Sequence, residues 1–438
     1  MPPVRSYWIT TFGCQMNEHD SERMAGLLEL QGYRRAAFQK DADLVIFNTC
    51  AIRENADHRL YGHLGALKQH KRTRPGMRVV VGGCLAEMDR HAIVEKAPWV
   101  DLVFGTRNID ALPGLLRRVE AQGIPVVEFA EALEVFPSAL PARRGSPFHA
   151  WVAIQYGCNN SCTFCIVPTV RGAEVSRRIG DILAEVRELA ADGVVEVSLL
   201  GQNVNSYGRD IYRTPRFAEL LYALADIPGL RRVRFTSPHP KDFREPVARA
   251  MAASPVVCEH LHLPVQSGSS KVLKEMKRSY SRQRYLNKVQ MARELIPGLA
   301  LTTDIIVGFP GETEEDFEDT LSLVEEVRYD AAYTFQYSPR PGTEAALRAD
   351  QIEKPVVQRR FDRLVEAQER ISLEGNRAHL GEVVEVLVEG PSKKNPARLA
   401  GRTRTNKLVH FTAEAAPGEF CRVRLTGAAP HHLEGEVA

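Results

Sequence analysis

The stretch Tyr156-Gly157-Cys158-Asn159-Asn160-Ser161-Cys162-Thr163-Phe164-Cys165 follows a short apolar run at residues 151–156. It places three cysteines four and three residues apart in one loop. Three thiolates this close can bind three irons of a cubane iron–sulfur cluster and leave the fourth iron open to a small ligand. A zinc site would need a fourth ligand, and His149 is the only other Cys or His within ten residues. The spacing therefore favours an iron–sulfur site over zinc.

Apolar runs continue on the C-terminal side of this loop at intervals of roughly 30–45 residues, as βα units require. Helical patterns lie between them, for example at residues 181–192 and 281–296. A closed eight-unit barrel needs about 250 residues, and this region is somewhat shorter. The pattern therefore predicts a partial (β/α)6 barrel over residues 149–375. Its expected strands are residues 151–156, 195–201, 231–237, 259–265, 300–307 and 331–337.

The N-terminal side, residues 1–120, also alternates between strand and helix patterns, which predicts a parallel α/β sheet covered on both faces. Three more cysteines, Cys14, Cys50 and Cys84, each come just past the end of an expected strand. Parallel strand ends share one edge, where ligands bind, so a second cluster site is plausible there. Three buried core thiols are the alternative, since free Cys is often buried. The expected strands are residues 6–12, 43–49, 78–82 and 100–105.

The C-terminal region, residues 376–438, contains short β-rich runs separated by Gly, Pro and Asn. This pattern predicts a small β-barrel of the oligonucleotide-binding type. Residues 121–148, with three prolines after Glu134, are expected to be a linker. Residues 393–407 hold six basic and no acidic side chains, which favours binding of an RNA backbone over a merely solvated charged face. The expected RNA contacts are Lys393, Lys394, Arg398, Arg402, Arg404 and Lys407.

Composition limits the remaining classes of protein. The 438 residues carry 57 basic and 55 acidic side chains, a formal charge of +2, which excludes a globally basic nucleic-acid coat. We expect neither a transmembrane helix nor a signal peptide, because the sequence has no long apolar run and no cleavage-site pattern. A cytoplasmic location follows, where the eight cysteines are more suited to metal or catalysis than to disulfides.

The Cys-x-x-x-Cys-x-x-Cys loop after the first barrel strand resembles the radical S-adenosylmethionine (SAM) superfamily. That resemblance implies a 4Fe-4S cluster on Cys158, Cys162 and Cys165, which are the expected catalytic residues. It also implies that the open iron binds SAM, whose reductive cleavage yields a 5′-deoxyadenosyl radical. The expected electron donor is a flavodoxin or ferredoxin.

Other stretches resemble methylthiotransferases more narrowly. They are residues 11–17, 48–56 and 82–86, which surround the N-terminal cysteines, and Arg171-Gly172 after the barrel loop. The resemblance implies a second 4Fe-4S cluster on Cys14, Cys50 and Cys84 that presents the sulfur, while a second SAM supplies the methyl group. The C-terminal module resembles the TRAM domain, which is linked to RNA binding.

Polar and glycine residues recur at the carboxyl ends of the barrel strands, where barrel enzymes keep their sites. Residues 304–312 resemble the superfamily strand that packs on the adenine of SAM. For Asn205 a turn and a ligand contact are equally compatible with the sequence. The expected SAM contacts are Phe164, Gly201, Gln202, Asn203, Gln266, Ile306 and Gly308.

Three substrates are compatible with the methylthiotransferase resemblance. MiaB-type enzymes act on isopentenyladenosine in a tRNA anticodon stem-loop, a second group acts on threonylcarbamoyladenosine in tRNA, and RimO-type enzymes modify a ribosomal-protein aspartate. Gly201-Gln202-Asn203 and residues 14–22 favour the MiaB type, as does the basic C-terminal stretch. A non-enzymatic RNA-binding protein with structural clusters is an alternative of a different class. Nothing in the sequence suggests more than a monomer.

Overall fold

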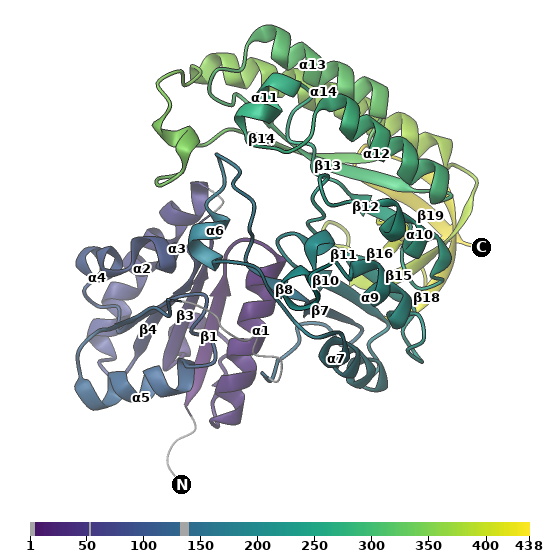
Figure 1. The fold of residues 1–438 in the computed structure, drawn as a ribbon. Coiled ribbons are helices and arrows are strands. Elements are labelled where there is room, and N and C mark those ends of the chain that lie inside the picture. The colour runs from purple at the N-terminus through teal and green to yellow at the C-terminus, as the bar shows by residue number, and fades with distance from the viewer. Residues whose placement is uncertain (1–4, 52–53, 132–139) are drawn as a thin grey trace.

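The computed structural model describes residues 5–51, 54–131 and 140–438. Three regions follow one another along the chain: a parallel sheet with helices on both faces, a curved array of parallel strands with helices outside, and a small closed barrel (Figure 1). The order of these regions confirms the predicted fold class.

All the strands of the N-terminal sheet are parallel. They are β1 (Ser6–Thr11), β2 (Arg34–Arg35), β3 (Leu44–Thr49), β4 (Arg78–Gly83), β5 (Leu102–Phe104) and β6 (Val126–Glu128). Their order is β2-β1-β3-β4-β5-β6, and the register pairs Ile46 with Ile9 on one side and Val80 on the other. The chain winds outward in opposite directions from β1 and β3, so the direction of strand order switches between them.

Helices cover both faces of this sheet because successive side chains of a strand point to opposite sides. Leu44 and Ile46 pack with α1 (Gln15–Leu30) and α5 (Leu112–Gln122). Val45 and Phe47 pack on the other face, which is covered by α2 (Glu54–Thr73), α3 (Cys84–Asp89) and α4 (His91–Lys96). The continuous apolar run of β3 is therefore buried on both sides.

The four strands expected in this region are all present, but β2 and β6 were not expected. Both are very short edge strands, and β2 is fully exposed, so neither carries a hydrophobic pattern. β6 lies within the stretch that we expected to be a linker, and it completes the sheet. The domain limits at residues 120, 148 and 375 stay a prediction.

The six strands expected for the central region are present. They are β7 (His149–Ala153), β10 (Glu196–Leu200), β11 (Arg232–Phe235), β12 (His260–His262), β13 (Ala300–Val307) and β14 (Ala331–Gln336). Hydrogen bonds join them as two parallel three-stranded sheets, β11-β10-β7 and β12-β13-β14. An isolated parallel bridge between Val233 and Val257 links the two halves. The result is an open, curved array rather than a closed barrel (Figure 1).

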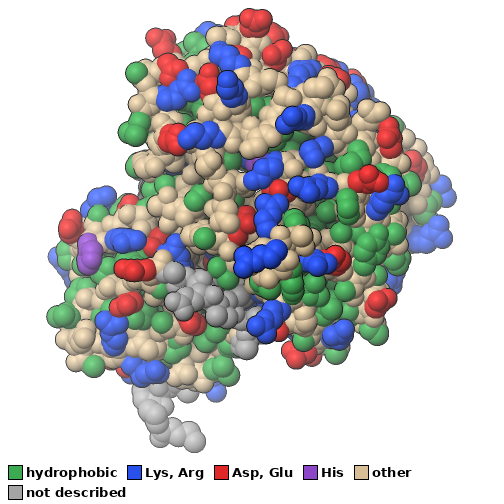
Figure 2. All heavy atoms as spheres, in the orientation of Figure 1, with side chains coloured by type: hydrophobic (Ala, Val, Ile, Leu, Met, Phe, Trp, Pro, Cys, Tyr) green, Lys and Arg blue, Asp and Glu red, His purple; other side chains and the backbone are tan. Residues whose placement is uncertain are grey.

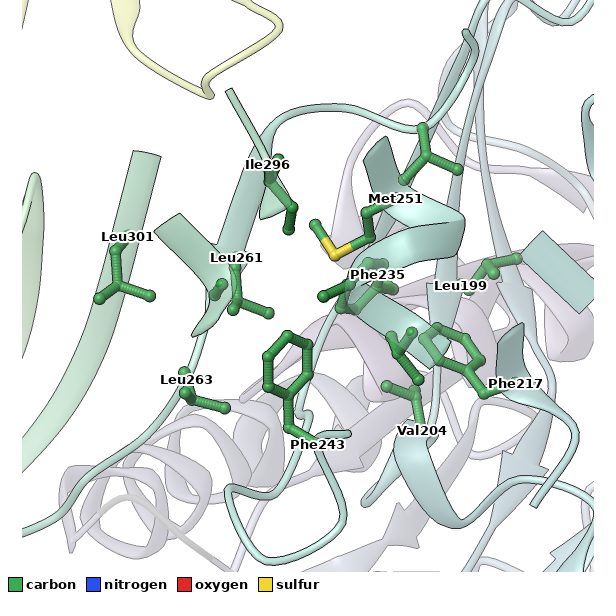
Figure 3. Close-up of a cluster of buried hydrophobic side chains, with 14 of the residues drawn as sticks. Leu199, Val204, Phe217, Phe235, Phe243, Met251, Leu261, Leu263, Ile296 and Leu301 are labelled. Atoms are coloured by element: carbon green, nitrogen blue, oxygen red, sulfur yellow. The ribbon is translucent and has the colours of Figure 1, made fainter. Parts of the chain in front are cut away.

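One large hydrophobic core fills the space between these strands and their helices. Figure 3 shows its centre, where Phe235 of β11 and Leu261 of β12 meet Phe243 and Met251. This packing joins the two halves where the hydrogen-bond ladder is thin. The surrounding helices are α7 (Ile179–Ala191), α9 (Phe217–Leu224), α10 (Glu245–Ala253), α12 (Arg282–Leu295), α13 (Glu314–Val327) and α14 (Lys354–Ala378). Shorter elements are β8 (Gln155–Tyr156), β9 (Val175–Ser176), α6 (Val167–Arg171), α8 (Arg209–Tyr212) and α11 (Ser270–Glu275).

The C-terminal region is a closed barrel of five strands. They are β15 (Val383–Pro391), β16 (Leu399–Thr403), β17 (Leu408–Thr412), β18 (Phe420–Ala428) and β19 (Leu433–Val437), in the order β15-β16-β17-β19-β18. The barrel docks on the central array through buried arginines of β11. Arg232 donates to the carbonyl oxygen of Arg402 (2.8 Å) and to the carboxylate of Glu385 (3.0 Å). Arg234 donates to the carbonyl oxygen of Thr403 (2.7 Å).

Within the described ranges, no helix combines the length and apolarity needed to cross a membrane.

Candidate cluster and cofactor site

Cys14, Cys50 and Cys84 lie at the carboxyl ends of three neighbouring strands. Cys14 precedes α1, Cys50 directly follows β3, and Cys84 is the first residue of α3. A Cβ atom on Gly13 would lie 2.8 Å from Sγ of Cys50, so this thiol reaches back to the chain beside Cys14. The edge between β1 and β3 is also where the strand order changes direction, the usual ligand position in such sheets. The sequence therefore placed these residues at one sheet edge correctly.

Hydrogen bonds from two side chains, Asn17 and Thr49, fix this edge. Asn17, in the first turn of α1, donates to the carbonyl oxygens of Thr49 (2.8 Å) and Phe12 (3.0 Å), which end β3 and follow β1. The Thr49 hydroxyl donates to the carbonyl oxygen of Gly82 in β4 (2.6 Å). The three strand ends that carry the cysteines are thus tied together without any bound group.

Burial controls the ionisation of Cys84. Cys50 and Cys84 are buried and Cys14 is half-buried. Burial raises the pKa of Cys84 to about 11, and the neighbouring thiols of Cys50 and Cys14 add to the rise, whereas the charge of Arg171 opposes it. A thiol in this position stays protonated until a metal displaces its proton. The donor set suits a group that binds thiolates strongly, such as iron.

The second set, Cys158, Cys162 and Cys165, lies on the loop between β8 and α6. Gly157 starts the loop with a φ of +75°, and a Cβ atom there would lie 2.0 Å from the carbonyl oxygen of Ala173. Only glycine fits this turn, which lets the loop fold back so that the Cys158 amide donates to the carbonyl oxygen of Gly172 (3.0 Å). The cysteine loop is therefore closed by the backbone itself.

Polar groups surround the sulfur atoms of this loop. The Asn160 amide side chain lies 3.3 Å from Sγ of Cys158, and Nη1 of Arg278 donates to Sγ of Cys162 (3.4 Å). Burial raises the pKa of Cys165 to about 12 and also raises the pKa of Cys158. The barrel-loop cysteines are half-buried, and hydrogen-bond donors lie beside the sulfur atoms of Cys158 and Cys162. We did not single out Arg278 from the sequence, because it lies far along the chain from Cys162.

Across the described ranges, no three His, Cys, Asp or Glu side chains converge on a single metal ion. A cubane cluster takes one thiolate per iron, so its ligands are spread around a cage and do not meet at a point. The described residues therefore contain no preformed site for a single metal ion such as zinc.

Two expected SAM contacts, Phe164 and Ile306, come together in the barrel mouth. Both are half-buried and pack with Tyr337 against one small apolar cluster. The hydroxyl of Tyr337 is buried and has no hydrogen-bond partner among the described residues. An apolar surface beside an unsatisfied polar atom suits a flat heterocycle such as adenine.

Buried amide groups follow β10. Oε1 of Gln202 and Oδ1 of Asn203 lack hydrogen-bond partners in the described part of the chain, although Nδ2 of Asn203 donates to Asp242 (2.8 Å). Asn205 is 1% exposed, and both its amide atoms lack partners there. Because buried polar groups are rarely left unsatisfied, this concentration indicates that hydrogen-bond partners are missing beside these amides. The orphaned amide of Asn205 favours ligand contact over a simple turn.

Two of the remaining expected SAM contacts, Gly201 and Gly308, are glycines, and the third, Gln266, has a positive φ. Gln266 has a φ of +73°, and its backbone pairs with Asp304 and Ile306 of β13 (2.9 Å each), so it lies beside the expected adenine strand. Gly201 is buried directly after β10. A Cβ atom on Gly308 would lie 2.5 Å from the Val357 side chain of α14, so Gly308 is required for helix packing. Its contact with SAM stays a prediction.

The expected RNA contacts divide into two groups. Arg404 pairs with Glu259 (2.7 Å), and Lys407 pairs with Asp330 (2.7 Å), both in the central array. Arg402 pairs with Glu389, and Arg398 donates to the carbonyl oxygen of His410. Lys393 and Lys394 are exposed. Much of the basic stretch therefore attaches the small barrel to the central array or stabilises the barrel itself. The charge pattern alone did not reveal this role.

Arg171 lies in a stretch that resembles methylthiotransferases, but the sequence did not identify it as a site residue. Its Nη2 donates to Oδ1 of Asn17 (3.0 Å) and Oδ2 of Asp20 (2.8 Å), and the Tyr156 hydroxyl donates to Oδ1 of Asp20 (2.7 Å). Both partners of Arg171 lie more than 150 residues earlier in the sequence, so no local pattern could reveal the contact. These bonds join the two regions beside the N-terminal cysteines.

Sequence models of three families match the chain in succession. They are an uncharacterized family, UPF0004, over residues 6–105, the radical SAM superfamily over residues 152–324, and the TRAM domain over residues 377–438. The structure of the radical SAM methyltransferase TsrM from Kitasatospora setae has a TM-score of 0.58 at 17% identity, covering 79% of this chain and 77% of that chain. This likeness supports the fold alone.

Relatives from actinobacteria are much more similar in sequence. The tRNA-2-methylthio-N(6)-dimethylallyladenosine synthase of Mycobacterium ulcerans is 57% identical over 98% of this chain and 83% of its own length. The synthase of the same name from Streptomyces coelicolor is 57% identical over 99% of this chain and 88% of its own. Membership of the radical SAM superfamily implies a 4Fe-4S cluster and SAM. This chain belongs to the MiaB-type family of tRNA methylthiotransferases.

Proposed function

We propose that this chain adds a methylthio group to C2 of N6-isopentenyladenosine next to the anticodon of tRNA. The observation that carries the proposal is the presence of two separate three-cysteine sites, one at a sheet edge and one in the barrel loop. The names of the most similar relatives supply the substrate. In the reaction the C2–H bond is replaced by a C–S bond, and a second SAM provides the methyl group on sulfur.

The barrel site suits the radical half of this reaction. Cys158, Cys162 and Cys165 would hold a 4Fe-4S cluster, which would supply the electron for SAM cleavage and thereby a radical for a C–H bond that acid–base chemistry does not break. Phe164 and Ile306 would hold the adenine of SAM between them. The amide atoms of Gln202, Asn203 and Asn205 that lack partners among the described residues would form hydrogen bonds with the polar groups of SAM.

The N-terminal site suits the sulfur half. Cys14, Cys50 and Cys84 would hold a second 4Fe-4S cluster whose open iron presents the sulfur. The edge that carries these thiols is pinned by Asn17 and Thr49, which keeps it rigid before the cluster binds. Tyr156 and Arg171 of the central region close over the same edge through Asp20.

The proposed partner is a tRNA anticodon stem-loop, whose loop bases are already partly unstacked, which lowers the cost of bringing the target base to the barrel mouth. Lys393 and Lys394 would contact the RNA backbone. Figure 2 shows further Lys and Arg side chains gathered over the middle of the face in view. We also propose that the protein acts as a monomer in the cytoplasm.

An acidic one-electron donor such as a flavodoxin or ferredoxin would reduce the barrel cluster. An open pocket of about 580 Å³ is lined by Ser161 of the cysteine loop and by Lys274, Arg278 and Arg284. Lys274 and Arg284 are exposed. Because Arg278 donates to Sγ of Cys162, this pocket offers a positively charged route to the cluster.

Anaerobic reconstitution followed by nucleoside mass spectrometry tests the function. The protein is given SAM, a reductant and tRNA that carries isopentenyladenosine, and the tRNA is then digested. We expect a new methylthio-isopentenyladenosine peak that disappears in Cys162→Ala and in Cys50→Ala.

The same assay separates the alternatives. Release of 5′-deoxyadenosine without this peak would redirect the substrate to threonylcarbamoyladenosine tRNA or to a ribosomal-protein aspartate. Absence of 5′-deoxyadenosine under these conditions would favour a non-enzymatic RNA-binding protein with structural clusters.

A further inference from the structure

Arg171 lies at the contact between the two cysteine sites. It ends α6, the short helix that follows the barrel loop, yet its side chain extends into the edge of the N-terminal sheet. Nη2 is held by Asn17 and Asp20, and only 3% of the side chain is exposed. A radical-domain residue is thus buried in the other domain's cysteine site.

Its neighbour in sequence confirms where α6 lies. Val170 packs in one apolar cluster with Cys84 and with Ala51, the residue after Cys50. The carbonyl oxygen of Val170 accepts a hydrogen bond from the Thr106 hydroxyl in the N-terminal region (2.8 Å). The end of α6 therefore covers the N-terminal cysteines directly.

The two terminal nitrogens of the Arg171 guanidinium differ in their partners among the described residues. Nη1 is inaccessible to solvent and has no hydrogen-bond partner among the residues that the structure describes. A buried guanidinium N–H is seldom left without an acceptor. Oδ1 of Asn17, which accepts from Nη2 (3.0 Å), also lies 3.6 Å from Sγ of Cys14, so the guanidinium lies beside the cysteine site. What is missing beside Nη1 is therefore an acceptor with negative charge at the cysteine site.

We propose that Arg171 is a positioning residue for the N-terminal cluster: Nη1 donates a hydrogen bond to a sulfur of the iron–sulfur group on Cys14, Cys50 and Cys84. Its positive charge then favours the reduced, more negative form of that cluster. This inference rests on the proposed function, because it requires a cluster at the N-terminal site. Since α6 directly follows the barrel loop, the same residue fixes the sulfur-bearing site relative to the site of SAM cleavage.

A purely structural role is the competing explanation, since the Arg171–Asp20 pair also joins the two regions. The reduction potential separates the two roles: where Lys keeps the charge and the ion pair with Asp20, a contact that only joins the domains leaves the potential of a bound cluster nearly unchanged, whereas loss of the Nη1 hydrogen bond shifts it. Arg171→Gln removes the charge, and Arg171→Lys keeps it but loses the planar fork. Arg178→Gln is the matched control, because Arg178 is exposed and close in sequence.

The experiment uses the full chain with Cys158, Cys162 and Cys165 all changed to Ala, so that only the N-terminal site can bind a cluster. This parent and the three variants are reconstituted anaerobically, their iron is counted, and the cluster is titrated by electron paramagnetic resonance. At equal iron content, we expect Arg171→Gln to make reduction at least tenfold less favourable, which is 59 mV for one electron. Arg171→Lys should show a smaller shift, and Arg178→Gln none.

An unchanged potential in Arg171→Gln at full iron content would overturn the proposal and leave a structural contact. If Arg171→Gln does not fold, Arg171→Lys provides the test. A spectrum and a reduction potential identical to those of the parent would then overturn the proposal. A parent that binds no iron would instead refute the second cluster of the proposed function, and the role of Arg171 with it. The two failures are thus distinguishable.

Discussion

The barrel cysteines lie on one loop between residues 158 and 165, whereas the N-terminal cysteines come from three strand ends between residues 14 and 84. The loop is shaped locally, by the turn at Gly157 and the hydrogen bond between Cys158 and Gly172. The sheet edge depends on strand order and on the bonds that Asn17 makes across it. A local motif thus builds one site and topology builds the other.

Each site also contains a buried arginine from a distant part of the chain, and the two arginines differ. Arg278 uses its whole guanidinium, donating to Tyr280, to Cys162 and to the carbonyl oxygen of Pro264. Arg171 keeps Nη1 without a partner in the described part of the chain. Arg278 is therefore fully paired within the protein, whereas Arg171 leaves one nitrogen for a further acceptor.

The largest expected effect is on iron content. Wild-type protein should bind about eight irons per chain after reconstitution, and changing either cysteine set to Ala should leave about four, because each cubane holds four. Iron and sulfide analysis with Mössbauer spectroscopy measures this. Loss of all iron from both triple variants would show that the sites are not independent.

The buried Asn205 amide, which lacks partners among the described residues, allows a test of whether the barrel site binds SAM through hydrogen bonds. Asn205→Ala should raise the KM for SAM about tenfold, the equivalent of about 1.4 kcal/mol for lost buried hydrogen bonds. Asn287→Ala, an exposed amide on α12, is the control and should leave the KM unchanged. An unchanged KM in Asn205→Ala would assign Asn205 to a structural turn.

The sequence was most informative where chemistry and pattern coincide. All six strands of the central array and the strand-end position of Cys14, Cys50 and Cys84 followed from apolar runs and their spacing. The sequence did not predict the very short edge strands, since β2 and β6 have too few residues for a periodic pattern.

Contacts between distant residues also escaped prediction. The basic stretch near Arg404 indicated RNA, but its contact with Glu259 lies 145 residues away and depends on how the small barrel docks. Arg171 shows the same limit, because its role depends on Asn17 and Asp20 in another region. Residue types and spacing thus identify the cysteines, while their charged surroundings require the structure.

Electron delivery should distinguish the two sites further, because the lining of the basic pocket includes Ser161 of the barrel loop and, among the described residues, none that neighbours the N-terminal cysteines. Lys274→Glu with Arg284→Glu should lower the rate of SAM cleavage driven by an acidic flavodoxin by about tenfold, and less at high salt. Cleavage driven by dithionite should stay the same. Arg72→Glu, exposed on α2, is the control. If the double variant loses the same SAM-cleavage rate with dithionite as with flavodoxin, the substitutions affect the cluster itself and not electron delivery.

The smallest expected effects concern RNA binding by the small barrel. Lys393→Ala and Lys394→Ala should each weaken tRNA binding a few-fold and reduce the salt dependence by about one phosphate contact. Arg404→Ala should instead lower the Tm and leave tRNA affinity nearly unchanged, because it loses its bond to Glu259. Binding titrations at several salt concentrations and thermal melts measure both. Weaker tRNA binding by Arg404→Ala without a lower Tm would contradict this division.

The division of labour between the two cysteine sites is tested most directly in one variant, Cys14, Cys50 and Cys84 all changed to Ala. This protein is given SAM, reductant and isopentenyladenosine-bearing tRNA, and both products are measured in the same sample. We predict that 5′-deoxyadenosine still forms while methylthio-isopentenyladenosine is absent. Formation of the methylthio product in this variant would contradict the account, because the N-terminal site would then not supply the sulfur.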